Sequence, residues 1–302
     1  MPRCGHVAIV GRPNVGKSTL LNHLLGMKLS ITSRKPQTTR RNLLGVDTRG
    51  DVQAIYVDTP GIHSAGSRQL NHIMVRSAVS ILADVDLIVA LFEHSRLTEE
   101  DEVVINHVAT AGVPAIAVLN KVDLLQDKSR LLPAMKALGE KTLGDRSVFR
   151  EILPLSALRN DGIELLRERV GASLPEAEHV FSEDQVTDAS ERYLVGEIIR
   201  EKLMRRLGDE LPHQTAVVVE AFRPGERLTE IQAEVFVEKD GQKAIVIGEG
   251  GQMLKAIGQD ARRDIEQLLD TRVMLNLWVK VRRGWTNDDR LLRRFGLGDF
   301  GN

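Results

Sequence analysis

Short apolar runs alternate with longer segments of helical periodicity through about the first 175 of the 302 residues. The apolar runs are rich in Val, Ile, Leu or Ala, which is typical of strands buried on both faces. They lie at His6–Val10, Gln53–Val57, Asp86–Phe92, Ala115–Leu119 and Glu151–Leu155. Helical spacing appears at Thr98–Ala111 and Ser129–Leu143. This alternation predicts an α/β domain with a mostly parallel sheet and helices on both sides.

One pair of runs departs from this alternation. Leu43–Thr48 and Val52–Val57 lie on either side of Arg49-Gly50. Two extended runs around a short turn that contains glycine predict an antiparallel hairpin at one edge of the sheet.

A polar, acidic stretch at residues 176–188 predicts a linker between a first domain, residues 1–175, and a second, residues 189–302. The second domain begins with a helix to about Leu207, which Asp188 can cap. The expected order is helix, strand, strand, short apolar segment, helix, helix, strand. The pieces after the first helix are Thr215–Phe222, Leu228–Val237, Lys243–Ile247, Gln252–Ile257, Ala261–Leu269 and Val273–Val281.

Composition narrows the class of protein. The length fits two domains, and the single cysteine, Cys4, cannot form an intramolecular disulfide, which fits a reducing, cytoplasmic environment. The chain has no run of 18 apolar residues, and its first residues lack the apolar stretch of a signal peptide. Residues 186–302 carry 19 basic and 20 acidic side chains, so neither the whole chain nor this part is broadly cationic.

A phosphate-binding motif follows the first predicted strand. Gly11–Ser18, GRPNVGKS, matches the P-loop pattern GxxxxGK[ST] and opens the predicted helix Ser18–Leu25, as phosphate binding requires. The glycines let backbone N–H groups wrap the phosphates, and the helix N-terminus adds positive charge. Lys17 is expected to contact the β and γ phosphates, and the Ser18 hydroxyl to bind Mg²⁺.

Polar motifs also follow three later strands, at the sheet edge where ligands of open α/β sheets bind. They are DTPG at residues 58–61, NKVD at 120–123 and SAL at 156–158. Asp58 is expected to hold Mg²⁺, and the Gly61 N–H to contact the γ phosphate. The two carboxylate oxygens of Asp123 match the adjacent N–H donors of guanine, which adenine lacks. The motifs therefore favour a guanine-nucleotide site over an adenine-specific P-loop ATPase or kinase.

Two neighbours of Asp123 have expected roles in the same site. The Lys121 stem can cover the base, and the Asn120 side chain can tie the loops together. The backbone of residues 156–158 is expected to contact the guanine oxygen.

A second glycine-rich motif, IGEGG at residues 247–251, precedes a predicted helix. In a KH module, a GXXG turn clamps a nucleic acid backbone while single-stranded bases lie against an apolar groove. The element order around this motif matches the type II KH arrangement. Glu249 is expected to point away from the phosphates. The expected contacts are Gly248, the N–H groups of Gly250 and Gly251, Gln252 and Lys255.

The stretch Thr271–Asn302 is locally basic, with seven Lys or Arg against three acids. This excess predicts a phosphate-facing patch that includes Arg282 and Arg283, or else a solvated helix end. Trp278, inside an apolar strand, is expected in the core. Trp285 follows a glycine and can either stack on a base or pack against the protein.

The motifs GRPNVGKS, DTPG, NKVD and SAL resemble, in sequence and order, those of the translation-factor-related GTPases, which share a Ras-like fold. Gln37-Thr38-Thr39-Arg40 is similar to their switch element, whose Thr ligates Mg²⁺ in the GTP state. Thr39 is favoured because Arg40 follows it, and Thr38 is the alternative. The resemblance implies Mg²⁺ ligands at Ser18, Thr39 and Asp58. It implies a GTP site formed by Gly11, Arg12, Pro13, Asn14, Val15, Gly16, Lys17, Ser18, Thr19, Asp58, Thr59, Pro60, Gly61, Asn120, Lys121, Asp123, Ser156, Ala157 and Leu158.

Ile62 departs from the Ras pattern, in which a Gln beside this glycine orients the attacking water. An isoleucine cannot do so by a hydrogen bond, so we expect slow intrinsic hydrolysis. The resemblance suggests that K⁺ held by Asn14 takes part. The expected catalytic residues are Lys17, Thr39, Gly61 and Asn14.

Two further stretches, SITSRKPQTTR at Ser30–Arg40 and ASERYLVGEIIREKL at Ala189–Leu203, extend the resemblance to essentially the whole chain. They are similar to bacterial ribosome-assembly GTPases that carry a C-terminal type II KH domain. The resemblance implies binding to 16S rRNA near its 3′ end, a role in 30S subunit assembly, and peripheral association with the inner face of the cell membrane. We expect a cytoplasmic monomer. The alternative is a constitutive RNA-binding protein whose G domain is mainly structural.

Overall fold

The computed structural model describes residues 1–302 except 34, 36, 64–68, 95–96, 209–210 and 298–302. The chain divides into two compact units, residues 1–67 with 71–188 and residues 68–70 with 189–302. Within the described ranges, no helix combines the length and apolar character needed to cross a lipid bilayer.

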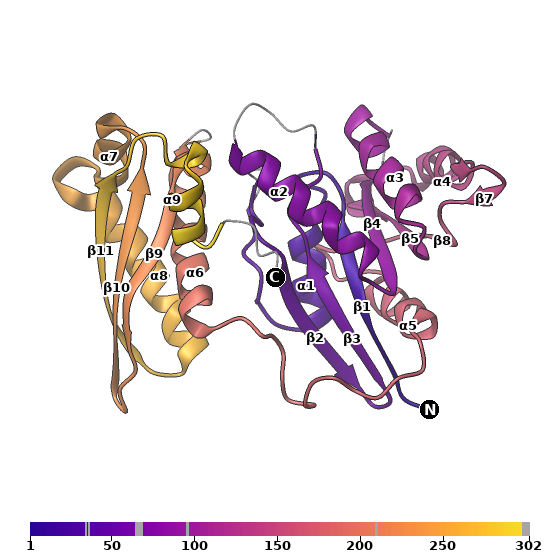
Figure 1. Ribbon diagram of the computed structural model, residues 1–302, viewed down its shortest axis with the longest axis horizontal. Coiled ribbons are helices and arrows are strands. Elements are labelled where there is room, and N and C mark those ends of the chain that lie inside the picture. Colours follow the sequence, from indigo (N-terminus) through magenta and orange to yellow (C-terminus); the bar gives the residue numbers. More distant parts are fainter. Residues whose placement is uncertain (34, 36, 64–68, 95–96, 209–210, 298–302) are drawn as a thin grey trace. The chain divides into compact units, whose positions relative to one another are not determined.

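The first unit contains a six-stranded sheet in the order β2-β3-β1-β4-β5-β8 (Figure 1). All neighbouring pairs are parallel except β2 and β3, which form an antiparallel hairpin. The predicted parallel sheet and its edge hairpin are therefore confirmed. The strands are β1 (Arg3–Val10), β2 (Leu43–Arg49), β3 (Val52–Asp58), β4 (Leu87–Glu93), β5 (Ala115–Asn120) and β8 (Glu151–Pro154).

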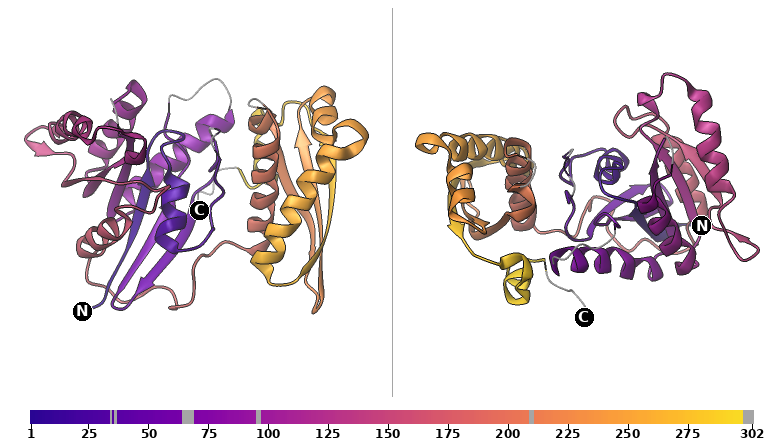
Figure 2. Two further views of the ribbon diagram at one scale, coloured as in Figure 1. Left: turned by 180° about the vertical axis from the view of Figure 1, so that it is seen from behind. Right: turned by 90° about the horizontal axis from the view of Figure 1, so that it is seen from above.

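Helices cover both faces of this sheet, as the alternation predicted (Figures 1 and 2). On one face α1 (Lys17–Leu25) and α5 (Ile163–Ser173) contact the hairpin strands. On the other face, α2 (Gln69–Ser80), α3 (Glu99–Ala111) and α4 (Leu131–Gly139) share a core with β4 and β5. Short 3₁₀ turns are η1 (Ile81–Ala83), η2 (Val122–Leu124) and η3 (Lys128–Arg130).

The helix predicted at Ser129–Leu143 is shorter than expected, because α4 ends at Gly139. The residues after it form a two-stranded hairpin, β6 (Thr142–Leu143) and β7 (Arg146–Ser147). Gly144 at the turn of this hairpin has a φ of 60°, a left-handed conformation that favours glycine.

The predicted linker is bound to the first unit along its length. The Ala177 N–H donates to Pro2 O (3.1 Å), and the Val46 N–H of β2 donates to Val186 O (2.8 Å). Between these points, the buried Gln53 side chain accepts from the N–H groups of Val180 and Phe181 (2.8 and 2.9 Å). A polar composition predicted the linker, but not that it would satisfy hydrogen-bonding groups of the sheet.

The second unit is a three-stranded sheet with its three longer helices on one face and a short C-terminal helix over part of the other (Figures 1 and 2). β10 pairs antiparallel with β9 and parallel with β11. The strands are β9 (Ala216–Arg223), β10 (Leu228–Val237) and β11 (Arg272–Val281). The helical elements are α6 (Glu191–Arg206), η4 (Leu211–Gln214), α7 (Asp240–Ile247), η5 (Glu249–Gly251), α8 (Gln252–Leu269), η6 (Trp285–Asn287) and α9 (Asp289–Arg294).

Three expectations for the second unit were wrong in detail: the division of its long helix into two, the inward position of Trp278, and the cap of α6. That cap is not Asp188 but Ser190, whose hydroxyl accepts from the Tyr193 N–H (3.3 Å). The apolar segment Lys243–Ile247 is the end of helix α7, and the two helices predicted after it are one continuous helix, α8. Trp278 is 46% exposed on the face of β11 that the three longer helices do not cover, because Val279 beside it takes the inward position. Trp285 packs: it is fully buried, donates from Nε1 to Gln214 O, and lies edge-on to Phe295.

Candidate guanine-nucleotide site

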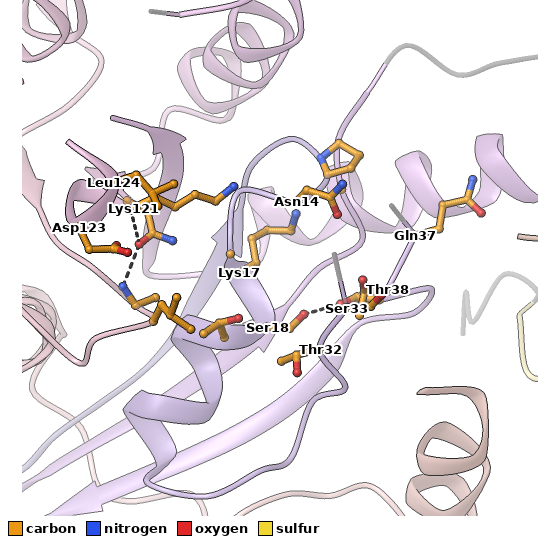
Figure 3. A pocket seen from close by; sticks show the side chains of 18 residues that line it. Asn14, Lys17, Ser18, Thr32, Ser33, Gln37, Thr38, Lys121, Asp123 and Leu124 are labelled. Atoms are coloured by element: carbon orange, nitrogen blue, oxygen red, sulfur yellow. Dashed lines mark hydrogen bonds between the residues drawn. The ribbon is translucent and has the colours of Figure 1, made fainter. Parts of the chain in front are cut away.

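A cavity of about 490 Å³ brings the predicted nucleotide motifs together (Figure 3). Lys121, Asp123 and Leu124 lie at one end, and Ser18, Thr32 and Thr38 lie toward the other. The predicted residues in its wall are Pro13, Asn14, Gly16, Lys17, Ser18, Thr19, Thr39, Gly61, Asn120, Lys121, Asp123, Ala157 and Leu158. Those outside the wall are Gly11, Arg12, Val15, Asp58, Thr59, Pro60 and Ser156.

The P-loop conformation depends on glycine at two positions. Gly11 has a φ of 151°, and a Cβ there would lie 2.6 Å from Leu91 O. Gly16 has a φ of 104°, and a Cβ there would lie 2.3 Å from Asn120 Nδ2. Any side chain at either position would displace the loop from the strand or from the Asn120 amide.

The Lys17 amine lies inside the P-loop. Its Nζ donates to the carbonyl oxygens of Gly11 and Arg12, each at 3.0 Å. Burial lowers the pKa of this amine to about 8, against the opposing attraction of Asp58. A buried amine that donates to two neutral carbonyl groups is well suited to bind phosphate oxygens instead.

Candidate magnesium ligands gather around Asp58 at the end of β3. The Ser18 and Thr39 hydroxyls donate to Asp58 Oδ2 at 2.8 and 3.0 Å, and they lie 2.9 Å from each other. The Thr38 hydroxyl instead donates to Lys35 O (3.0 Å). The structure thus brings Thr39, the favoured switch residue, to the other two ligand candidates.

Asp58 has the properties expected of a carboxylate that binds a cation. It is fully buried, and burial raises its pKa although three hydroxyls donate to it. Its second oxygen, Oδ1, is buried without a hydrogen-bond partner among the described residues. Hard oxygen donors of this kind are those that Mg²⁺ prefers, so the residues present fit this metal.

The Asn120 side chain joins three loops at the other end of the cavity. Its Nδ2 donates to Val15 O in the P-loop (2.7 Å), and its Oδ1 accepts from the N–H groups of Lys121 and Ala157 (2.7 and 2.9 Å). The Ser156 hydroxyl donates to Asp123 Oδ1 (2.5 Å). Asp123 is therefore held from the adjacent loop and lines the cavity.

Two acidic residues of this site were missed by sequence reasoning. Glu93, at the end of β4, bonds both to Arg12 of the P-loop (2.5 Å) and to Lys121. Asp101, which caps α3, also pairs with Arg12 (3.1 Å). Partial burial alone would raise the pKa of Glu93, but its bonds to Lys121 and Arg12 hold it below the usual value. Only its position at a strand end could have indicated Glu93.

Ile62 and Asn14 differ in their access to the cavity. Ile62 is fully buried in the core beneath α2 and α3, and its N–H donates to Gly11 O (3.1 Å). Asn14 is exposed, has a φ of 66° and lines the cavity. The Ile62 side chain therefore points away from any bound phosphate, whereas Asn14 is beside the P-loop opening.

The glycine turn of the second unit also has a demanding geometry. Gly248 has a φ of 74°, and a Cβ there would lie 2.6 Å from the Met253 Cβ. Gly250 and Gly251 also have positive φ values, but open space surrounds them. A cavity of about 390 Å³ lies beside the turn, between α8 and β11. Its lining includes Gly251, Leu254, Lys255, Leu275 and Leu277.

The polar and charged residues of the predicted RNA surface are exposed to solvent. Glu249, Gln252 and Lys255 are exposed around the turn. Arg282 and Arg283 follow β11 and are exposed. The Arg283 Nη2 atom lies 3.8 Å from Asp240 Oδ2.

Two families match separate parts of the chain. A family described as 50S ribosome-binding GTPase matches residues 6–121, and the KH domain family matches residues 210–286.

Curated relatives match along nearly the full length. The chain is 52% identical over 297 residues to GTPase Era of Ectopseudomonas mendocina, covering 98% of both chains. It is 50% identical to GTPase Era of Pseudomonas aeruginosa, covering 98% of this chain and 96% of the relative.

Solved structures agree with these relatives. A variant of Aquifex aeolicus Era bound to GDP.AlF4- is 38% identical with a TM-score of 0.93, and the match covers 98% of this chain and 100% of that one. Era in complex with MgGDPNP and nucleotides 1506–1542 of 16S ribosomal RNA is 37% identical with a TM-score of 0.94, covering 99% and 100%.

Proposed function

The chain belongs to the Era family of GTPases, and we propose that it binds and hydrolyses GTP and binds 16S rRNA near its 3′ end during 30S subunit assembly. One observation carries the enzymatic part. A single cavity contains the buried Lys17 amine, the Ser18 and Thr39 hydroxyls and the Asp123 carboxylate. Phosphate, metal and base can therefore be bound together.

Nucleotide binding uses groups that are already in place. Lys17 exchanges its two carbonyl partners for the β and γ phosphates, and P-loop N–H groups wrap the same phosphates. Ser18, Thr39 and Asp58 hold Mg²⁺, which neutralises phosphate charge when bound. The related structure with MgGDPNP supports this assignment. The Gly61 N–H contacts the γ phosphate.

Hydrolysis does not rely on a glutamine beside Gly61, because Ile62 is buried and cannot orient water. We therefore propose a slow intrinsic rate that rises with K⁺, with the cation held by the exposed Asn14. GTP hydrolysis measured in equal concentrations of KCl and NaCl should be faster in KCl, and Asn14→Ala should remove the difference. Equal rates in both salts, or undiminished stimulation in Asn14→Ala, would contradict this.

A substitution at Asp123 tests how the site recognises the base. We expect Asp123→Asn to weaken GTP binding by about a hundredfold, the cost of losing charge-assisted hydrogen bonds. The same change should improve binding of XTP, because xanthine carries an acceptor where guanine has its exocyclic amine, and Asn can donate. Competition binding with GTP, XTP and ATP measures both effects.

Asp145→Asn is the matched control, since Asp145 is exposed at the β6–β7 turn. Unchanged GTP affinity in Asp123→Asn would refute the guanine assignment. ATP binding tighter than GTP binding in the unaltered protein would favour an adenine-specific P-loop enzyme instead.

We assign RNA binding to the second unit because it carries the GXXG turn and the cavity beside that turn. Apolar side chains of α8 and β11 line that cavity with Lys255, and single-stranded bases suit such a surface. The related structure with a 16S rRNA fragment supports the identity of the RNA. A monomeric state, a cytoplasmic location and peripheral membrane association stay predictions that rest on sequence reasoning and family resemblance alone.

A further inference from the structure

Three hydroxyl groups converge on one oxygen of Asp58. Two belong to the candidate magnesium ligands Ser18 and Thr39. The third is Ser30, whose Oγ donates to Asp58 Oδ2 at 2.7 Å, the shortest of the three distances. Ser30 is 3% exposed and is not part of the nucleotide cavity wall. It can therefore reach the carboxylate but not a nucleotide in the cavity.

Ser30 is itself held by the helix that follows the P-loop. Asn22 of α1 accepts from the N–H groups of Leu29 and Ser30 with Oδ1 (2.9 and 2.8 Å). The Asn22 Nδ2 donates to Ser30 O (2.7 Å). Three bonds from one amide fix the backbone of Ser30 relative to α1, which begins at Lys17. The Ser30 hydroxyl thus has a set position with respect to the phosphate site.

The three hydroxyls cannot serve the same purpose. The Ser18 and Thr39 oxygens have to turn toward a cation when one binds, and Thr39 belongs to a loop expected to move with nucleotide state. Ser30 has no such second task. Its bond engages Oδ2 and leaves the buried Oδ1 without a partner among the described residues.

We propose that Ser30 is a positioning residue, which holds the Asp58 carboxylate in the orientation that nucleotide-bound Mg²⁺ requires. This inference rests on the proposed function, since it concerns the metal of the same GTP site. Because Ser30 acts through Asp58, its loss should matter only when Mg²⁺ is present. A residue that merely supports the fold of the loop would affect nucleotide binding with or without the metal.

The test is the release rate of a fluorescent GDP analogue from the full chain, measured at several Mg²⁺ concentrations and in excess EDTA. In Ser30→Ala we expect release in Mg²⁺ to be about tenfold faster, the effect of one hydrogen bond to a charged group. The Mg²⁺ concentration that half-maximally slows release should rise by a similar factor. Release in EDTA should match that of the unaltered protein.

Two further variants keep the test specific. Ser30→Thr retains a hydroxyl and should restore slow release, whereas Asn22→Ala should reproduce the Mg²⁺-dependent defect because it frees Ser30. Ser173→Ala, which removes an exposed hydroxyl of α5, is the control and should change nothing.

The outcomes separate this inference from the function on which it rests. If Mg²⁺ does not slow GDP release from the unaltered protein, the proposed metal site fails. If it does, but Ser30→Ala behaves like the unaltered protein, the positioning role is wrong. Faster release from Ser30→Ala to the same extent in EDTA and in Mg²⁺ also overturns it, because the role is then structural.

Discussion

Single residues in the nucleotide site owe their chemistry to burial more than to their type. Lys17 and Asp58 are both buried and attract each other, and burial shifts the pKa of each in the direction that favours its neutral form. The Ile62 side chain is also fully buried, but it contributes only packing. The P-loop pattern predicted Lys17 and Ser18 directly. Ser30 and Glu93 carry no motif, and only their contacts with Asp58, Arg12 and Lys121 identify them.

The pKa of Lys17 leads to a prediction about pH. Its value falls from 10.5 to about 8 in the folded chain, so between these values the unfolded chain binds more protons. The contribution of Lys17 to the free energy of unfolding therefore rises with pH, by about 2 kcal/mol from pH 7 to pH 9.5. Lys17→Met lacks this contribution.

Urea unfolding of both nucleotide-free proteins measures the effect as a difference. The stability of Lys17→Met relative to the unaltered protein should decrease by about 2 kcal/mol from pH 7 to pH 9.5. Other titrating groups, such as Tyr56, occur in both proteins and cancel. A difference that stays constant with pH would show that Lys17 is not held in a desolvated site.

At the scale of elements, the apolar pattern predicted the helices and strands that have long, regular periodicity. It was wrong or silent where that periodicity is interrupted. An apolar run of five residues fits a strand or a buried helical turn equally well, so the end of α7 could not be assigned by periodicity. Gly258 divided α8 in the pattern, yet the helix continues through it, and a Cβ there would lie 3.5 Å from Leu277. A glycine that allows close packing looks the same in sequence as one that ends a helix.

The turn between α7 and α8 is the element on which RNA binding depends. We expect Gly250→Asp to abolish RNA binding, because a carboxylate there repels the phosphates that the turn clamps. The protein should still fold and hydrolyse GTP at an unchanged rate. A Cβ at Gly250 meets no other atom, and a residue with positive φ costs about 1 kcal/mol.

Electrophoretic mobility shift with a single-stranded 16S rRNA fragment, together with GTPase assays, checks this prediction. Gly241→Asp introduces the same charge at the start of α7, where a Cβ also meets open space, and should retain RNA binding. Retained binding in Gly250→Asp would count against the clamp.

The whole molecule joins a nucleotide site and a candidate RNA surface, neither of which depends on net charge. Residues 1–185 carry 22 basic and 22 acidic side chains, and the remainder carries 19 and 20. RNA binding therefore has to use the glycine turn, the apolar cavity and the local excess of four charges in Thr271–Asn302. Such a surface selects bases more than it attracts polyanions.

We predict that RNA affinity differs between the GTP-analogue and GDP states, since GTP orders the switch loops of this class of enzyme. We also predict a modest salt dependence, with a slope of log affinity against log salt no steeper than about −3 for four charges on single-stranded RNA. Fluorescence anisotropy with labelled RNA in both nucleotide states, at several KCl concentrations, measures both. Identical affinities in the two states would favour a constitutive RNA-binding protein, and a much steeper slope would indicate general polyanion binding.

The sequence by itself determined the fold class, the order of the nucleotide motifs and the presence of a GXXG turn. These depend on local spacing: strands of limited length, glycines at turns, and polar residues directly after strands. Tertiary structure alone decided which partners surround each group. The linker satisfies Gln53, Ser30 reaches Asp58 from another loop, and Glu93 joins Arg12 to Lys121. Contacts between residues far apart in the sequence determine which groups are buried, and burial in turn determines their pKa values and hydrogen-bond partners. A local sequence pattern therefore does not predict these partners or pKa shifts.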